Sequence, residues 1–255
     1  MRADTHYIDL LEGRSAPAFV APVLPDRSHE SVPLQPEAPD PALHAGRDLA
    51  KALATLASCS ALLADTSSDL SRAVVSDLLR AEAWRASALL HATRVVRKEL
   101  PIAWTAIPVS GVLDKVVLAF QPQRRVRPVT IDARSAMPSG SLVVGDEQIL
   151  VGALSWSLLS SLAVVDGIND ARMTLSVGLD PKAGVTFAVS QSSVTPPAIW
   201  QTRAFDPGWA DRPGGVPGLL WMLALREVAH AHGGTARVER SGRGTTIGFS
   251  LPAGV

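Results

Sequence analysis

The sequence has 255 residues, enough for two modest domains or for one large domain with a tail. Lys and Arg together number 24, as do Asp and Glu, so no net charge draws the chain toward nucleic acid or an anionic membrane. The single cysteine, Cys59, excludes an internal disulfide and a cysteine-based metal cluster. The sequence has no run of about 18 uninterrupted apolar residues. The first residues also lack a secretory pattern, so we expect a cytoplasmic protein without a membrane span.

Residues 1–42 are rich in proline, with seven prolines between positions 17 and 41. Proline blocks helix formation and removes the N–H that a sheet would use. We therefore expect residues 1–42 to be an N-terminal arm or linker, mobile unless its apolar pieces dock on a partner surface.

Residues 43–100 carry two helical patterns separated by a polar break at 65–69. The first helix has leucines at helical spacing, at positions 49, 53, 56, 62 and 63. The second has a stripe made of Leu70, Val74, Leu78, Trp84, Leu89 and Val95. Two long helices with a short connection predict an antiparallel hairpin. The stripe is too wide for one partner helix, so we expect two copies to pair as a four-helix bundle.

Residues 101–255 alternate between strand and helix patterns. Strands are expected near 106–109, 128–133, 173–180 and 184–192, and helices near 112–120 and 146–165. A loop rich in Pro and Gly spans 195–217, and three arginines at 124, 125 and 127 read as a solvated turn. A helix and a strand hairpin fill 219–252. The predicted fold class is α+β, with the helical hairpin followed by an α/β sandwich whose mixed sheet is covered on one face by helices.

Five segments resemble, in order, the elements of sensor histidine kinases over residues 43–255. They are GRDLAKALATLASCSALLAD (46–65), VGDEQILVGALSWSLLSSLAVV (144–165), FAVSQSSVTPP (187–197), FDPGWADRPGGVPGLLWMLAL (205–225) and LLWMLALREVAHAHGGTARVERSGRGTTIGFSLP (219–252). The resemblance implies a dimerisation hairpin followed by an ATPase-like domain of the Bergerat type. It also gives His232, in Ala-His-Gly-Gly, a role at the end of a helix.

The family's phosphoacceptor histidine falls on Arg47 in this sequence. A neutral imidazole nitrogen is a good nucleophile near pH 7, whereas a guanidinium stays protonated and cannot attack a phosphoryl group. His44, three residues upstream, and His91 in the second helix are the alternative acceptors.

The residues that would hold Mg-ATP are also replaced. The magnesium-binding Asn falls on Ser160, with Trp156 one turn earlier, and the Asp-x-Gly-x-Gly positions of the adenine site fall on Gln191, Ser193 and Thr195. The glycines of the phosphate loop map near Pro217, Leu219 and Trp221. Trp156 and Trp221 either fill the pocket or are ordinary core aromatics. We therefore expect no ATP, no magnesium and no other metal.

These losses predict a catalytically inactive, histidine-kinase-like signalling protein. By resemblance, it would act as a homodimer that binds a response-regulator receiver domain or a kinase as scaffold or regulator. The expected partner surface on the first helix comprises Arg47, Asp48, Lys51 and Thr55. The alternatives are an ATP-independent histidine phosphotransferase that uses His44 or His91, and a divergent active kinase.

Overall fold

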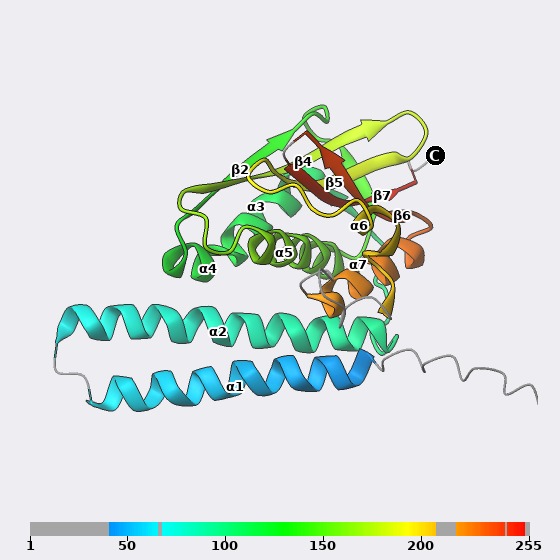
Figure 1. The fold of residues 1–255 in the computed structure, drawn as a ribbon. Coiled ribbons are helices and arrows are strands. Elements are labelled where there is room, and N and C mark those ends of the chain that lie inside the picture. The colour runs from blue at the N-terminus through cyan, green and yellow to red at the C-terminus, as the bar shows by residue number, and fades with distance from the viewer. Residues whose placement is uncertain (1–40, 66–67, 208–217, 243, 253–255) are drawn as a thin grey trace, which may run out of the picture. The chain divides into compact units, whose positions relative to one another are not determined.

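A computed structural model describes residues 41–65, 68–207, 218–242 and 244–252, without the side chains of residues 41–44 and 241. All of these residues belong to one compact unit, Ala38–Val255. The expected arm over residues 1–42 lies outside the described ranges except for its last two residues, which begin the first helix. Figure 1 shows the ribbon.

Two long helices form the predicted hairpin, α1 (Pro41–Asp65) and α2 (Asp69–Val96). Small side chains line the face of α1 that packs on α2: Ala45, Ala52 and Cys59 are all buried. Small residues let the two backbones approach closely, which explains why one cysteine sits among alanines and serines. Ser68 is the extended residue before α2, and its side chain makes no cap bond.

The α/β part contains a five-stranded mixed sheet with the order β2-β4-β5-β7-β6. Its strands are β2 (Val129–Ser135), β4 (Ala171–Asp180), β5 (Gly184–Gln191), β6 (Thr235–Ser241) and β7 (Gly244–Leu251). Only β2 and β4 run parallel, and the other neighbours are antiparallel. Two further strands, β1 (Thr105–Pro108) and β3 (Leu142–Gly145), pair with each other. The mixed sheet was predicted.

Three helices cover one face of this sheet (Figure 1): α3 (Val109–Ala119), α5 (Glu147–Val164) and α7 (Leu219–Ala231). Helix α5 contacts α2, α3, α7 and the sheet, which is why its apolar side chains show no single stripe. It is the one described helix long and apolar enough to cross a membrane, but 72% of that stretch is buried in the fold, as in a core helix.

Three short elements were not predicted: β3, α4 (Gln121–Val126) and α6 (Trp200–Arg203). The interpretation of the basic cluster as a solvated turn was wrong, because Arg124 and Arg125 form the last turn of α4. Nitrogen Nη1 of Arg125 lies 3.3 Å from Oδ1 of Asp77 on α2, so the cluster faces the hairpin as well as solvent.

Specific contacts join α2 to the α/β part. Gln123 donates from Nε2 to the carbonyl oxygen of Ala81 at 2.8 Å. The ring of Trp84 meets that of Phe120 edge to face, with centroids 5.4 Å apart. One face of α2 therefore packs on α1 and another on the sheet-covering helices, which fixes α2 between two layers.

Candidate functional site

The end of β5 carries Gln191, at the position where the resemblance places the adenine-binding aspartate. Its side chain is 4% exposed. Nitrogen Nε2 donates to the carbonyl oxygen of Val194 at 2.7 Å and to Oγ1 of Thr245 at 2.9 Å. Oxygen Oε1 accepts from the backbone N–H groups of Ser193 at 2.7 Å and of Val194 at 2.9 Å. The partners fix which amide atom is oxygen, and they use both donors and both lone pairs.

The two positions after Gln191 where the resemblance expects glycine carry exposed side chains, Ser193 and Thr195. The hydroxyl of Thr195 donates to the carbonyl oxygen of Gly242, in the turn between β6 and β7, at 3.3 Å. The segment after β5 is thus tied to the neighbouring hairpin turn through side chains that the glycines of the family's motif do not have.

The start of α7 lies where the resemblance places the phosphate loop, and Pro217 itself lies outside the described residues. Gly218 precedes the helix with φ +76°, a conformation that glycine adopts at no steric cost. A Cβ at this position would overlap the ring of Trp221. Leu219 and Trp221 are buried, at 6% and 4% exposure, so bulky side chains occupy the start of the helix. The guanidinium carbon of Arg85, on α2, lies 5.5 Å from the centre of the Trp221 ring.

Helix α5 carries Ser160 and Trp156, at the expected magnesium position and one turn before it. The indole of Trp156 is 1% exposed and donates from Nε1 to the carbonyl oxygen of Ala88, on α2, at 3.2 Å. Its ring also meets that of His91, with centroids 5.3 Å apart. Trp156 therefore serves the contact between α5 and α2.

The hydroxyl of Ser160 is fully buried and has no hydrogen-bond partner among the described residues. No group of three or more His, Cys, Asp or Glu side chains that could hold a metal occurs in the described part of the chain. Since the amide of Gln191 has no bonding capacity left and Ser160 is closed off, these residues do not fit a magnesium nucleotide.

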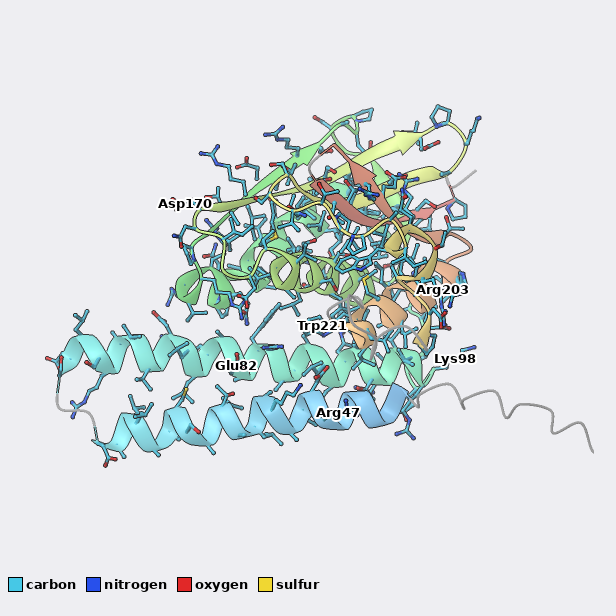
Figure 2. All side chains as sticks on the ribbon, in the orientation of Figure 1. Arg47, Glu82, Lys98, Asp170, Arg203 and Trp221 are labelled. Carbon is cyan, nitrogen blue, oxygen red and sulfur yellow. The ribbon has the colours of Figure 1, made fainter. Side chains whose placement is uncertain are left out.

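The predicted partner residues lie together on α1, at spacings that place them near one face of the helix. The ammonium of Lys51 lies 3.7 Å from the carboxylate of Asp48, and the hydroxyl of Thr55 donates to the carbonyl oxygen of Lys51 at 3.0 Å. Arg47 is exposed one residue before Asp48. Figure 2 shows Arg47 on the hairpin, on the other side of α2 from Trp221.

The two alternative acceptor histidines have different surroundings. His44 lies in α1, and its side chain is outside the described part of the structure. His91 is half-buried where α2 faces α5, and burial holds its pKa below the ordinary value, with a smaller contribution from the Arg94 guanidinium. The ring is therefore neutral at pH 7, but it lies between helices, away from the exposed face of α1.

His232 has the expected role at the end of α7. Its ring nitrogen Nδ1 lies 2.8 Å from the carbonyl oxygen of Val228, one turn earlier, and its Nε2 lies 3.4 Å from the backbone N–H of Asp146. The side chain therefore joins the last turn of α7 to the first residue before α5.

Solved structures with the same arrangement of helices and strands were found by comparison. The Acinetobacter baumannii histidine kinase AdeS matches with a TM-score of 0.54 at 10% identity, over 82% of this chain and 98% of the solved AdeS chain. The matched 82% is a larger share of the chain than residues 101–255 make up, so the match extends into the helical hairpin. The chain has the histidine-kinase fold.

Two further histidine kinases with this fold match similarly. Full-length ShkA, solved in complex with AMPPNP, gives a TM-score of 0.53 at 16% identity, over 83% of this chain and 45% of ShkA. The catalytic domain of ThkA, in a nucleotide-free form, gives 0.51 at 16% identity, over 59% of this chain and 95% of the domain. At these identities the likeness concerns the fold. Comparison of the sequence with family models and with curated proteins gave no significant match.

Sequence reasoning missed the roles of two charged side chains. Arg85 and Asp146 had no expected role, yet one covers Trp221 and the other caps α5, accepting at Oδ1 from the N–H of Ile149 at 3.1 Å. The cap had a sequence signal, because Asp directly before a helical apolar pattern is a common N-cap. The contact of Arg85 had none, since it depends on two elements far apart in the chain.

Proposed function

We propose that this chain is a catalytically inactive, histidine-kinase-like signalling protein that acts by binding. In this proposal it is a homodimer that binds a two-component partner, either a receiver domain or a kinase, as scaffold or regulator. The observation that carries the proposal is the closed bonding of Gln191, whose amide uses every donor and lone pair within its own chain.

The proposal that neither ATP nor magnesium binds has a physical basis both at the adenine position and at the phosphate position. An adenine amino group would have to displace the backbone N–H of Ser193 or Val194 from Oε1 of Gln191, which breaks a hydrogen bond worth about 0.5–1.5 kcal/mol. At the start of α7, Leu219 and Trp221 occupy space in which a phosphate-binding loop brings bare backbone to the ligand. Each substitution alone would weaken nucleotide binding modestly, and together they remove the affinity for Mg-ATP.

The first test is thermal unfolding with and without millimolar Mg-ATP. A ligand that binds only the folded state at about 100 times its dissociation constant adds about 2.7 kcal/mol of stability, which raises the melting temperature by several degrees. We expect no shift beyond that given by magnesium sulfate alone. A clear shift in melting temperature that requires the nucleotide would contradict the proposal and favour a divergent active kinase.

The surface proposed for a receiver domain is the exposed face of α1 around Arg47, Asp48, Lys51 and Thr55. By resemblance, this is the helix on which a kinase presents its phosphoacceptor to the acidic pocket of a receiver. An arginine at that position offers a permanent positive charge with a planar fork of donors, which pairs with carboxylates. The chain would then hold the receiver without transferring phosphate.

The second test measures the affinity of a receiver domain that the full chain binds. We expect Arg47→Ala to weaken binding by about tenfold or more, because a charge-assisted contact is lost. Arg80→Ala is the matched control, since Arg80 is an exposed, ion-paired arginine on α2, outside the proposed surface. Equal affinities for the Arg47 variant and the unmutated chain would exclude this surface.

A further inference from the structure

A cavity of about 520 Å³ lies between α2 and the first half of α5, apart from the degenerate nucleotide residues at β5 and α7. This volume is in the range of pockets that hold small organic ligands. Its lining includes Trp84, His91, Arg94, Asp146, Gln148 and Trp156. The proposed function does not use this cavity, although the resemblance maps Trp156 to one turn before the magnesium position and His91 is one of the alternative acceptors.

The imidazole of His91 lines the cavity. A Cβ on Gly152 would lie 3.0 Å from its Cε1 atom, so the glycine gives the ring room against α5. His91 makes no hydrogen bond to any other described residue, although its ring is half-buried. A half-buried imidazole with two unused nitrogens is a donor and an acceptor ready for a ligand.

The cation of the cavity is Arg94. It lies one turn after His91, forms no ion pair within the described ranges, and its exposed side chain reaches the cavity from the last turn of α2. The carboxylate of Asp146 also lines the cavity, where its oxygens cap α5 and accept from the N–H groups of Ile149 at 3.1 Å and Ala103 at 2.9 Å. The groups left to hold an anion are therefore Arg94 and His91.

The walls favour a flat apolar body on that anion. Trp84 is half-buried and gives an aromatic surface, and half-buried Leu100 adds an aliphatic one. Trp156 and Ile149 are buried and form the floor beneath them. Aromatic rings pack well against indoles, by edge or by offset face. One guanidinium matches one carboxylate or sulfonate, whereas a triphosphate would need several cations.

We propose that this cavity between α2 and α5 binds a small aromatic carboxylate or sulfonate of one or two rings. Arg94 pairs with the acid group, His91 donates an N–H to it, and the ring system packs against Trp84. Because α2 and α5 supply opposite walls, such a ligand bridges the helical hairpin and the α/β part, and it stabilises their packing.

The test is titration calorimetry of the full chain with 1-naphthoate, and with 1-naphthamide as the uncharged ligand of the same shape. We expect 1-naphthoate to bind, and 1-naphthamide to bind at least about tenfold more weakly, because it cannot pair with Arg94. Arg94→Gln is expected to weaken 1-naphthoate binding by about tenfold or more. Arg97→Gln removes an equal charge three residues away, where the arginine pairs with Glu99 at 2.8 Å, and is expected to bind within about twofold of the unmutated chain.

Two results would overturn the proposal. The first is no binding of 1-naphthoate at millimolar concentration. The second is equal loss of binding in the Arg94 and Arg97 variants, which would mean that general charge attraction and no defined site holds the anion. Both arginines are exposed, so neither substitution disturbs the packed core, and circular dichroism of each variant checks that the fold is kept.

Discussion

At the residue scale, Gln191 and Trp221 stand where the resemblance places ligand-binding residues, and both side chains contact their own chain. Gln191 makes four hydrogen bonds within its own chain and so holds the end of β5 to β7 and to its own following turn. Trp221 packs under Arg85 of α2, and Gly218 makes room for its ring. Residues that contact the protein's own core stabilise the fold without any ligand.

Trp221→Ala should therefore destabilise the protein by about 3–5 kcal/mol, because it leaves a large cavity among buried side chains. The measurement is unfolding by urea, followed by circular dichroism. The same variant should still show no Mg-ATP-dependent shift in melting temperature, since Gln191 and Ser160 are unchanged.

Trp221→Phe is the matched control for this prediction. It keeps most of the ring volume and removes an indole N–H that has no partner among the described residues, so its cost should stay below about 1.5 kcal/mol. If the alanine variant were as stable as the phenylalanine variant, Trp221 would not be filling space in the core.

The same residues show how much of the candidate site the sequence could predict. The resemblance predicts which positions would line a nucleotide site, because it gives each a residue number. Their present bonding was not visible, because the partner of Gln191 on β7 is 54 positions away and the partner of Trp156 on α2 is 68 positions away. Spacing along the chain carries no information about such pairs until the elements are packed.

At the element scale, predictions succeeded where the pattern was long and local. The ranges of α1, α2 and α5 follow their apolar spacing and polar breaks. The sequence did not predict strand β3, because its four residues become a strand through pairing with β1, some 40 positions earlier. The sequence did not predict helix α4, because it has only six residues and is held in part by a hydrogen bond from Gln123 to α2.

Helix α2 makes the fold sensitive to pH at His91. Burial lowers the pKa of this imidazole below 6.5, Arg94 lowers it further, and Asp146 on the facing segment opposes the shift. The unfolded chain therefore takes up a proton near pH 6.5 while the folded chain does not, and stability falls as pH drops below that value. A difference of one bound proton between the unfolded and folded chains changes the free energy of unfolding by about 1.4 kcal/mol per pH unit. The change from His91 is a fraction of this value, because solvent screens a half-buried group.

The measurement is urea unfolding between pH 5 and pH 8, with His91→Gln compared with the unmutated chain. The variant should lose less stability below pH 6.5. His230→Gln removes an exposed histidine and should keep the full dependence. An unchanged slope in the His91 variant would mean that other groups cause the loss.

At the scale of the whole molecule, the hairpin has two kinds of surface. The side of α2 toward the α/β part is buried, as at Leu89 and Ala92. Other apolar side chains of the hairpin are not covered: Leu53, Leu62, Leu70, Val74 and Leu78 are 55%, 56%, 77%, 54% and 37% exposed. The last three recur every four residues and form one stripe on α2. A second copy is the proposed cover for this stripe, as in the four-helix bundle expected from the sequence.

Sedimentation equilibrium of the full chain at micromolar concentration should therefore give a dimer. Covering one leucine is worth about 1.5–3 kcal/mol, so several in each copy outweigh the entropy lost on association. The double variant Val74→Glu with Leu78→Glu should sediment as a monomer, because it would place four carboxylates in the interface. Leu118→Glu is the matched control: Leu118 lies on α3 and is 72% exposed, outside the hairpin, so this variant should remain a dimer. A monomeric unmutated chain would contradict the predicted bundle, and dissociation by both variants would place the interface beyond the hairpin.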